Sequence, residues 1–421
     1  MRKAAFALLV AVSTAAPAGA GDVPELHGHV KLQSSLQLFR HDDLGALLAG
    51  SHPDDSTLDL RLDTVWRRSR WDLAVDAQLL AIGGDGVNAR SNPLAGDLAG
   101  FLLGVPTPSD QLQWLDLSHT FSSGGSRLVF GRLDRLSVGY TGDRLVMRLG
   151  RQALSWGGGL VFQVLDLFNP FPPTVIDTDY KPGTDMLTAQ WLLAGGDDLQ
   201  AVVVPRRPGP GRRVSADASS LAVKWHHFAG STEVELMGAR HYADTVAGIG
   251  ASGNLGGGVW RVNATYTALA HGGRVTSLLA NLDRSWVWGG RNAYGFVEYF
   301  RNGFGTPSLD RGAAALPESL LVRLARGELF NLGRNELAGG LRFEWTPRLA
   351  LEPTVIVNLD DLSSMLLFRV TFDWLENLQL DAGLQTGAGP RGTEYGGVPV
   401  GFPSPYAAPG RRIWLRLSRY F

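Results

Sequence analysis

Ile413-Trp414-Leu415-Arg416-Leu417-Ser418-Arg419-Tyr420-Phe421 ends the chain with a segment whose two faces differ in polarity. The apolar face carries Ile413, Leu415, Leu417 and Phe421, and the polar face carries Arg416 and Ser418. Successive side chains of a β-strand point to opposite sides, so this period of two predicts a strand. Apolar residues on one face and polar residues on the other are what a lipid-embedded barrel strand requires. The segment therefore predicts a transmembrane β-barrel.

The aromatic residue at the last position, Phe421, resembles the signal that bacterial outer-membrane assembly machinery reads. This resemblance implies a location in the outer membrane of a Gram-negative bacterium, with that machinery, the membrane lipids and lipopolysaccharide as partners. Arg419 departs from the pattern, but a long cationic side chain near the membrane interface can extend toward water. The alternative is the terminal strand of a soluble β-sandwich.

The N-terminus predicts a secretory leader. Arg2 and Lys3 form a basic region, residues 4–12 form an apolar region, and Ala18-Gly19-Ala20 matches a cleavage site. We therefore expect residues 1–20 to be a signal peptide and residues 21–421 to form one barrel domain.

Composition excludes several classes of function. The chain has 39 basic and 40 acidic residues, and removal of Arg2 and Lys3 leaves 37 against 40, a formal charge of −3. This balance does not indicate a nucleic-acid partner. The chain has no cysteine, which excludes disulfides, thiolate metal sites and cysteine nucleophiles.

After the leader, no stretch of 18 or more predominantly apolar residues is free of charge, so helical membrane spans are not expected. A chain that crosses lipid without such helices must form a closed barrel, because an open sheet would leave backbone donors unpaired in hydrocarbon. Regular alternation recurs along the chain, as in residues 26–38, 58–67 and 366–373, and the polar faces of the last two segments carry charges of both signs. The segments are commonly ten or more residues long, whereas strands of soluble proteins average about five or six.

The connections alternate between short and long, as in barrels with short periplasmic turns and long outer loops. The long ones are expected at residues 40–56, 153–184, 302–334 and 387–410. The segments indicate an all-β, antiparallel, single-domain barrel of 18 strands, with 16 or 20 as alternatives because residues 81–140 are ambiguous.

The most distinctive segment is Leu149-Gly150-Arg151-Gln152-Ala153-Leu154-Ser155-Trp156-Gly157-Gly158-Gly159, followed by Asp166-Leu167-Phe168-Asn169-Pro170. A strand that ends in Gly-Arg-Gln, with an aromatic-glycine pair shortly after, resembles the motif of proteobacterial porin-like barrels. It resembles the alginate-export family of 18-stranded barrels more faintly. The first resemblance implies a channel for small solutes, and the second implies export of a secreted polysaccharide.

Strict alternation would place Arg148 and Gln152 toward the lumen and Arg151 toward lipid. Two solutions remain open. Either a bulge at Gly150 turns Arg151 inward, or the strand ends and Arg151 meets lipopolysaccharide phosphates. We expect the following loop, residues 153–184, to fold into the lumen and narrow it, since an empty 18-stranded cylinder is a wide pore. A solvated outer loop is the alternative.

We expect the pore wall and its constriction to be lined by charged and amide side chains from both halves of the chain. These are Asp59, Arg61, Asp63, Arg148, Arg151, Gln152, Asp166, Asn169, Asp177, Asp179, Lys181, Arg342, Glu344, Arg369 and Asp373. Mixed charges on a narrow wall select solutes by charge and size. The sequence thus predicts a channel for diffusion of small polar or anionic solutes, with a polysaccharide exporter as the alternative.

Other chemistry is less well supported by the sequence. Asp177, Asp179 and Asp185 could bind Ca²⁺, but their spacing lacks the glycine and terminal glutamate of an EF-hand loop. No Gly-x-Ser-x-Gly element is present, which argues against a hydrolase. A structural or adhesin barrel remains a further alternative. No enzymatic activity, catalytic residue, cofactor or bound metal is predicted.

Overall fold

The computed structural model describes residues 26–90, 103, 109–401 and 405–421. The predicted signal peptide and its cleavage site lie outside the described residues. No helix in the described part of the chain is both long enough and apolar enough to cross a bilayer.

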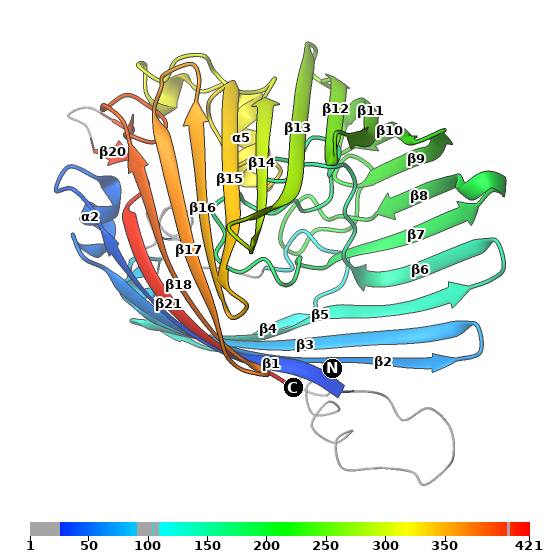
Figure 1. The fold of residues 1–421 in the computed structure, drawn as a ribbon, viewed down its shortest axis with the longest axis horizontal. Coiled ribbons are helices and arrows are strands. Elements are labelled where there is room, and N and C mark those ends of the chain that lie inside the picture. Colours follow the sequence, from blue (N-terminus) through cyan, green and yellow to red (C-terminus); the bar gives the residue numbers. More distant parts are fainter. Residues whose placement is uncertain (1–25, 91–102, 104–108, 402–404) are drawn as a thin grey trace, which may run out of the picture.

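Eighteen antiparallel strands of the described chain form one closed wall (Figure 1). They are β1 (Leu26–Leu38), β2 (Asp54–Arg68), β3 (Trp71–Gly84), β5 (Arg127–Thr141), β6 (Leu145–Gln152), β7 (Thr184–Leu192), β8 (Asp198–Val204), β9 (Ser220–Ala229), β10 (Thr232–His241), β11 (Asp244–Leu255), β12 (Gly258–Ala268), β13 (Arg274–Trp288), β14 (Arg291–Arg301), β15 (Asn335–Thr346), β16 (Leu349–Asn358), β17 (Ser364–Leu375), β18 (Leu378–Ala388) and β21 (Arg411–Tyr420). The predicted fold class and strand number are confirmed.

The wall closes between its first and last strands. β21 pairs with β18 on one side and with β1 on the other. Gly28 and Phe421 exchange two backbone hydrogen bonds, of 2.9 and 3.1 Å, which complete the ladder at this seam. The first spanning strand is thus paired with the last, which is the condition for placing a sheet in hydrocarbon.

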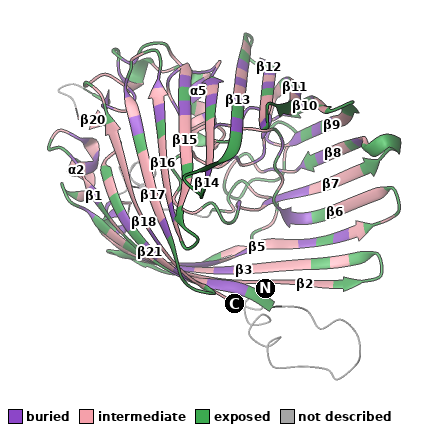
Figure 2. Cartoon of the chain, in the orientation of Figure 1, coloured by how far each residue is buried: buried purple, intermediate pink, exposed green. Residues whose placement is uncertain are grey.

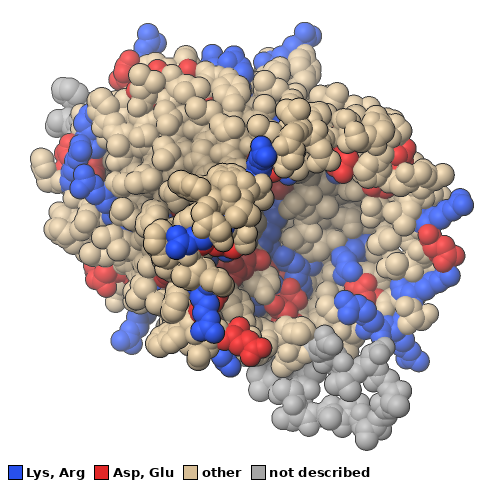
Figure 3. Space-filling view, viewed as in Figure 1, with Lys and Arg blue, Asp and Glu red and all other residues tan. Residues whose placement is uncertain are grey.

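The two faces of the wall have the polarity that the sequence predicts. On β1, His29 and Lys31 are buried, whereas Leu32 and Leu36 are exposed. Buried residues recur at intervals along the strands (Figure 2). Charged side chains gather in the hollow at the centre of the molecule (Figure 3). The apolar residues therefore face outward, and most inward positions are polar.

The barrel has a short-turn end and a long-loop end. Both the start of β1 and the end of β21 lie at the short-turn end (Figure 1), where two-residue turns such as 289–290 and 376–377 connect strands. The long-loop end carries the predicted long connections, which run between the strands as residues 39–53, 153–183, 302–334 and 389–410. These loops contain the short elements α2 (Leu44–Ala49), η2 (Ala313–Ala315), α5 (Glu318–Ala325), β19 (Val398–Pro399) and β20 (Tyr406–Ala407).

The ambiguous region 81–140 contains a further element. After α3 (Asp85–Arg90), the short strand β4 (Ser118–Gly124) pairs with the first half of β5, on the edge that β6 occupies farther along. Between them the chain reaches the interior, where the Leu103 carbonyl accepts hydrogen bonds of 2.7 Å from Gln37 Nε2 and from Arg412 Nη2. β4 is thus an addition to the barrel wall rather than a nineteenth spanning strand.

Part of the interior is apolar, which the alternation did not predict. Trp156, Leu165 and Phe168 of the loop after β6 pack against inward side chains of the wall such as Met186 and Val202. A second cluster joins Phe162 and Val164 of the same loop to side chains of β13 through β17. These contacts explain why apolar residues occupy inward positions on the strands that the loop covers.

Candidate constriction site

The loop between β6 and β7, residues 153–183, lies inside the ring of strands (Figure 1). One carboxylate holds its first part. Glu298 of β14 accepts hydrogen bonds of 2.6 to 2.9 Å from the backbone nitrogens of Leu160, Val161 and Phe162. Three donors in a row to one buried acceptor give the loop a defined position, because each would otherwise be unsatisfied away from water.

The middle of the loop turns at Asn169. This residue adopts a positive φ of 69°, and its side-chain nitrogen donates to the Pro182 carbonyl at 3.0 Å. Asparagine tolerates the left-handed region better than most residues because its side chain bonds locally. Residues 170–181 therefore form a projection whose two ends are held together.

The ion pair Asp166–Lys181 lies at the base of this projection. Lys181 Nζ approaches Asp166 Oδ2 at 2.5 Å and also donates to Ser155 Oγ at 3.1 Å. Burial raises the pKa of Asp166 to about 6, although the Lys181 charge opposes the change. Burial likewise lowers the pKa of Lys181, against the pull of Asp166. Both directions show that loss of hydration outweighs the attraction between the two charges.

The tip of the projection contacts the seam between β1 and β21. Lys31 Nζ lies 2.6 Å from both Asp177 Oδ2 and Asp179 Oδ2. Tyr420 donates its hydroxyl to Asp179 at 2.7 Å, and Arg416 Nη1 lies 3.2 Å from Asp177. These contacts from two neighbouring strands fix the two aspartates across the interior.

Arg61 of β2 forms a second charged centre beside the tip. Its guanidinium pairs with Asp63 at 2.6 Å, with Asp76 at 2.7 Å and with Asp134 at 3.1 Å. The ring of Tyr180 lies over the same guanidinium, with 4.0 Å between the ring centroid and Cζ. Asp134 also pairs with Arg135 at 2.6 Å and with Arg132 at 3.4 Å, so three arginines balance the three acids of this cluster.

On the other side of the seam, Asp381 of β18 links two arginines. Arg369 Nη2 donates to Asp381 at 2.8 Å, and Arg416 Nη2 lies 3.2 Å away from it. Thr371 also donates to Asp381 at 2.8 Å. Arg416 thereby connects the wall to the loop tip through Asp177. We call Lys31, Arg61, Asp177, Asp179 and Arg416, with their direct partners, the constriction site.

Several buried polar atoms of the constriction site lack a hydrogen bond within the protein. They are both ring nitrogens of His29, Nη1 of Arg416 and the hydroxyl of Ser418. His29 lies opposite Tyr420 across the seam, and Lys31 lies opposite Ser418. Buried polar groups normally have a partner, protein or water. Two of these atoms nevertheless lie near carboxylates of the protein: His29 Nε2 is 3.5 Å from Asp59 Oδ2, and Arg416 Nη1 is 3.2 Å from Asp177 Oδ2.

Other predicted pore residues lie away from the tip. Arg148 pairs with Asp72 at 2.7 Å and donates to Ser137. Gln152 donates to two backbone carbonyls, and Asp59 accepts from Gln78. These side chains face the interior but belong to separate clusters on the β2–β7 part of the wall.

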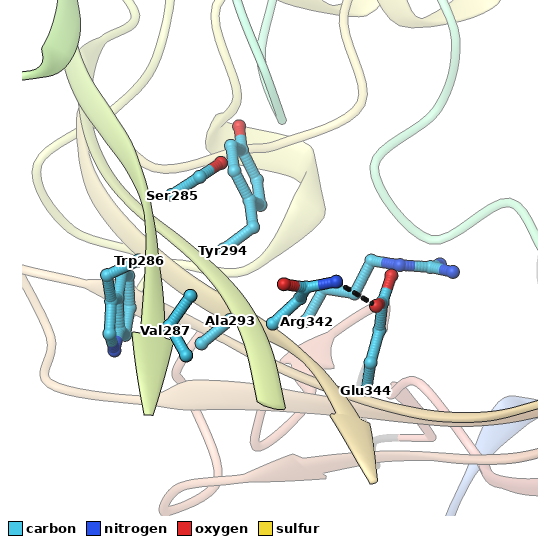
Figure 4. A pocket seen from close by; sticks show the side chains of 8 residues that line it. Ser285, Trp286, Val287, Ala293, Tyr294, Arg342 and Glu344 are labelled. Carbon is cyan, nitrogen blue, oxygen red and sulfur yellow. Dashed lines mark hydrogen bonds between the residues drawn. The ribbon is translucent and has the colours of Figure 1, made fainter. Parts of the chain in front are cut away.

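Arg342 and Glu344 of β15 lie near the short-turn end and line a cavity of about 370 Å³ (Figure 4). Asn292 donates to Glu344 at 2.8 Å, and Arg342 pairs with Glu352. Asp373 lies near the same end of β17, where its backbone nitrogen donates to the Arg348 carbonyl. The structure does not bring these residues to the loop tip.

Arg151 requires a correction. The pairing of β6 with both neighbouring strands is regular through Gly150 and Arg151, so the expected bulge at Gly150 is absent. The Arg151 side chain is only 3% exposed, so it does not reach lipopolysaccharide either. It pairs instead with Asp185 at 2.8 Å and Asp110 at 2.7 Å, beneath the chain leading to β4. Arg151 therefore joins segments of the wall and has no free donor for a solute.

The same pairing separates the three aspartates considered as a Ca²⁺ site. Asp185 binds Arg151, whereas Asp177 and Asp179 bind Lys31. Among the residues that the structure describes, no group of three or more metal-ligating side chains is placed to hold a metal ion.

Sequence reasoning missed the basic and acidic partners of the predicted residues. Lys31, Arg416, Asp381 and Glu298 each organise part of the site. The first three lie on polar strand faces that the alternation identifies, whereas Glu298 shares its face of β14 with Phe296 and Phe300. Alternation shows that such side chains point inward, but it cannot show which of them meet across the barrel.

Comparisons with known proteins support the fold. No family model matches the chain, and no curated protein matches its sequence. Among solved structures, OccK8 (OprE) of Pseudomonas aeruginosa is similar over 96% of this chain and 99% of that chain, with 10% identity and a TM-score of 0.53. A BenF-like porin from Pseudomonas fluorescens Pf-5 is similar over 96% and 100%, with 12% identity and a TM-score of 0.52. OccD3 (OpdP) of Pseudomonas aeruginosa is similar over 97% and 93%, with 10% identity and a TM-score of 0.51. The barrel thus has the fold of these porins, and the comparisons give no support to the likeness to alginate-export barrels.

Proposed function

We propose that the chain is an outer-membrane channel for the diffusion of small polar or anionic solutes. One observation carries this proposal: a closed, outwardly apolar barrel contains an inward loop whose charged tip lies against charged side chains of the wall. A wide cylinder narrowed by a charged loop admits solutes by size and charge. The similar solved structures support the proposal, because they are porins with the same fold.

The orientation follows from the two ends of the barrel. Short turns face the periplasm and long loops face outward in barrels of this kind. The outward leucines and valines would contact lipid, and the exposed arginines of the long loops would meet lipopolysaccharide. Phe421, which completes the seam with Gly28, is the proposed signal for the assembly machinery.

The charge arrangement favours small solutes over a polymer. An exporter of an anionic polysaccharide needs a continuous track of arginines, but here acids alternate with the cations, as around Arg61 and Arg416. Such alternation produces a field across the pore rather than along it. Polar solutes with separated charges would be oriented by this field as they pass.

The test is single-channel conductance of the folded protein in planar bilayers, before and after removal of the projection. Residues 170–180 can be replaced by Gly-Ser, because the Asn169 to Pro182 contact already brings the two ends together and Asp166–Lys181 is retained. We expect conductance to rise, since the tip no longer occupies the interior.

A matched control shortens another loop at the same end. Arg206 and Ser215 are joined by a backbone hydrogen bond of 3.1 Å, so residues 208–213 can be removed without opening the barrel wall. This variant should conduct like the unmodified protein. If the folded protein conducts neither before nor after removal of the projection, the channel proposal is wrong.

A further inference from the structure

We propose that one stretch of the outer rim is a binding site for lipopolysaccharide, with arginines holding the phosphates of the lipid anchor and exposed apolar side chains contacting its acyl chains. This stretch consists of residues 109–117, which precede β4, and of the loop between β8 and β9, residues 205–219. We call the two segments together the rim patch. The inference rests on the proposed orientation of the barrel in the outer membrane, and the rim patch lies apart from the constriction site.

Residues 109–117 complete the wall beyond two short strands. At one end of the segment, Gln113 pairs with Arg206, just after β8. At the other end, the Leu117 carbonyl accepts a hydrogen bond of 2.9 Å from the Leu133 nitrogen of β5. Between these attachments lie β6, with eight residues, and β7, with nine, whereas β5 has 15. The segment therefore crosses the outer ends of β6 and β7.

The same segment covers the outward side of these strand ends. Regular pairing places Arg151 of β6 and Asp185 of β7 on the outward face of the wall. Both are nevertheless buried beneath Leu115, whose nitrogen donates to Asp185 Oδ2 at 2.6 Å and whose carbonyl accepts from Arg151 Nη2 at 2.9 Å. Leu112 and Trp114, which alternate with the covered residues of the segment, are exposed. We infer that these two side chains face the membrane.

The loop after β8 is attached to the outward side of the rim at both of its ends. Near its start, Arg207 donates from its backbone nitrogen to the Leu112 carbonyl at 3.0 Å and from Nη2 to the Trp114 carbonyl at 2.6 Å. Near its end, Asp217 accepts a hydrogen bond of 2.8 Å from Arg240, which is exposed on the outward face of β10. The loop and residues 109–117 thus form one continuous surface on the outside of the barrel.

The apolar part of the rim patch continues the lipid-facing wall. Trp114 is 42% exposed, and Leu112 and Val214 are exposed to a similar extent. Val203 and Leu221, at the outer ends of the two strands that carry the loop, are exposed on the lipid-facing side. Tryptophan is enriched where a membrane meets water, because its ring is apolar and its N–H group is polar. These side chains are therefore suited to acyl chains at the outer surface of the membrane.

Arginines form the polar part of the rim patch and its edge. Arg212 and Arg213 are exposed, and neither forms an ion pair with a carboxylate of the described residues. The adjoining Arg240 pairs with Asp217, but both side chains are more than half exposed, so water weakens this attraction. Three exposed arginines thus face two exposed acids, Asp116 and Asp217. The rim patch therefore carries an excess of positive charge.

A phosphorylated lipid matches both parts of this surface. A guanidinium group donates two parallel hydrogen bonds to phosphate oxygens, so phosphate fits the arginines. A dissolved phosphate would leave the exposed leucine and tryptophan in water, and an uncharged lipid would leave the arginines without an anion. In lipopolysaccharide the phosphates lie next to the acyl chains, as the arginines lie next to the apolar side chains here. Charge attraction and apolar contact then act on the same molecule.

Titration of purified lipopolysaccharide onto the folded protein in neutral detergent, followed by native mass spectrometry, tests the proposal. We expect Arg212→Gln/Arg213→Gln to raise the apparent Kd by about tenfold or more, because two charges near an anionic lipid are lost. Trp114→Gln should also raise it, because the apolar contact is lost. The matched control, Arg274→Gln/Arg311→Gln, removes two exposed arginines from other parts of the outer end and should leave the Kd unchanged.

Two further probes identify the chemistry that is bound. Lipopolysaccharide with a dephosphorylated lipid anchor should bind the unmodified protein about as weakly as intact lipopolysaccharide binds the double arginine variant. Inorganic phosphate alone should not displace intact lipopolysaccharide. An unchanged Kd in the double variant or in Trp114→Gln, an equal loss in the control, or displacement by inorganic phosphate would each overturn the proposal.

Single-channel conductance separates this proposal from the proposed channel function. The rim patch lies outside the lumen, so the double arginine variant should conduct like the unmodified protein whether or not it binds lipopolysaccharide. Loss of lipid binding with normal conductance supports the rim patch as a separate site. Loss of conductance in this variant, once folding is verified, would contradict the assignment of the rim patch to the outside of the barrel.

Discussion

Lys31 Nζ lies 2.6 Å from Asp177 Oδ2, although 146 residues separate the two in the chain. The same ammonium group reaches Asp179 at the same distance. Lys31 belongs to the first strand and the aspartates belong to the projection of the inward loop. The buried lysine is therefore the one side chain of β1 that binds both aspartates, beside Arg416 and Tyr420 of β21.

Replacement of this lysine should release the tip. In Lys31→Met the stem still packs, but Asp177 and Asp179 lose the ammonium group that they share and keep only Arg416 and the Tyr420 hydroxyl as partners at the seam. Because both aspartates are about one-third exposed (33% and 29%), we expect a loss of about 1–3 kcal/mol, below the cost of breaking a fully buried pair. Single-channel recordings should show larger current fluctuations. Arg70→Met, in an exposed turn, is the control and should record like the unmodified protein; equal noise in both variants would mean that Lys31 does not hold the tip.

Ion preference should respond to Arg148. Arg148→Glu would place a second acid beside Asp72 at an inward, partly exposed position. The permeability to cations should therefore rise, and the permeability to anions should fall. A change of about 0.4 to 1 kcal/mol corresponds to roughly a two- to fivefold change in the cation-to-anion permeability ratio. The reversal potential in a salt gradient measures it. Arg148→Gln should give an intermediate value, and no shift in either variant would place Arg148 outside the conducting path.

Two exposed valines test the assignment of the faces. Val297 of β14 is 47% exposed on the outward face, and Val287 of β13 is 68% exposed beside the cavity of Figure 4. Val297→Arg should destabilise the barrel by about 2–4 kcal/mol, because the charge enters lipid near its midplane. Val287→Arg should change the free energy of unfolding little, since the side chain at position 287 contacts water. Unfolding by denaturant in bilayers measures both, and equal costs would contradict the assignment.

The buried Asp166 should make stability depend on pH. Burial raises the pKa of Asp166 from 3.8 to about 6. The contribution of this group to the free energy of unfolding is therefore complete below about pH 4 and is lost as the pH rises to about 6. Two pKa units correspond to about 3 kcal/mol. Denaturant unfolding between pH 4 and 7 should show this decline in the unmodified protein. Asp166→Asn should lack it, and an identical decline in both would assign the dependence to another group.

The barrel itself could be predicted from the sequence because its physical cause is local. The polarity of the two faces of a strand can be seen from the residues of that strand alone, as in residues 413–421. A chain that crosses lipid with strands must close them into a barrel. The strand number followed from counting segments, even though residues 81–140 concealed β4. The inward loop was also expected from its position and composition.

The site depended on the tertiary structure, because its contacts join residues that only barrel closure brings together. Alternation placed Lys31 on an inward face, but its meeting with Asp177 requires the loop to cross the interior and β1 to close against β21. Arg151 shows the opposite case. It belongs to the most distinctive motif, but it forms ion pairs with Asp110 and Asp185 and does not contact the loop tip. The sequence by itself determined which faces are polar, since that depends on neighbours two residues apart. Only the tertiary structure decided which charges pair, since Coulomb attraction depends on distance in space.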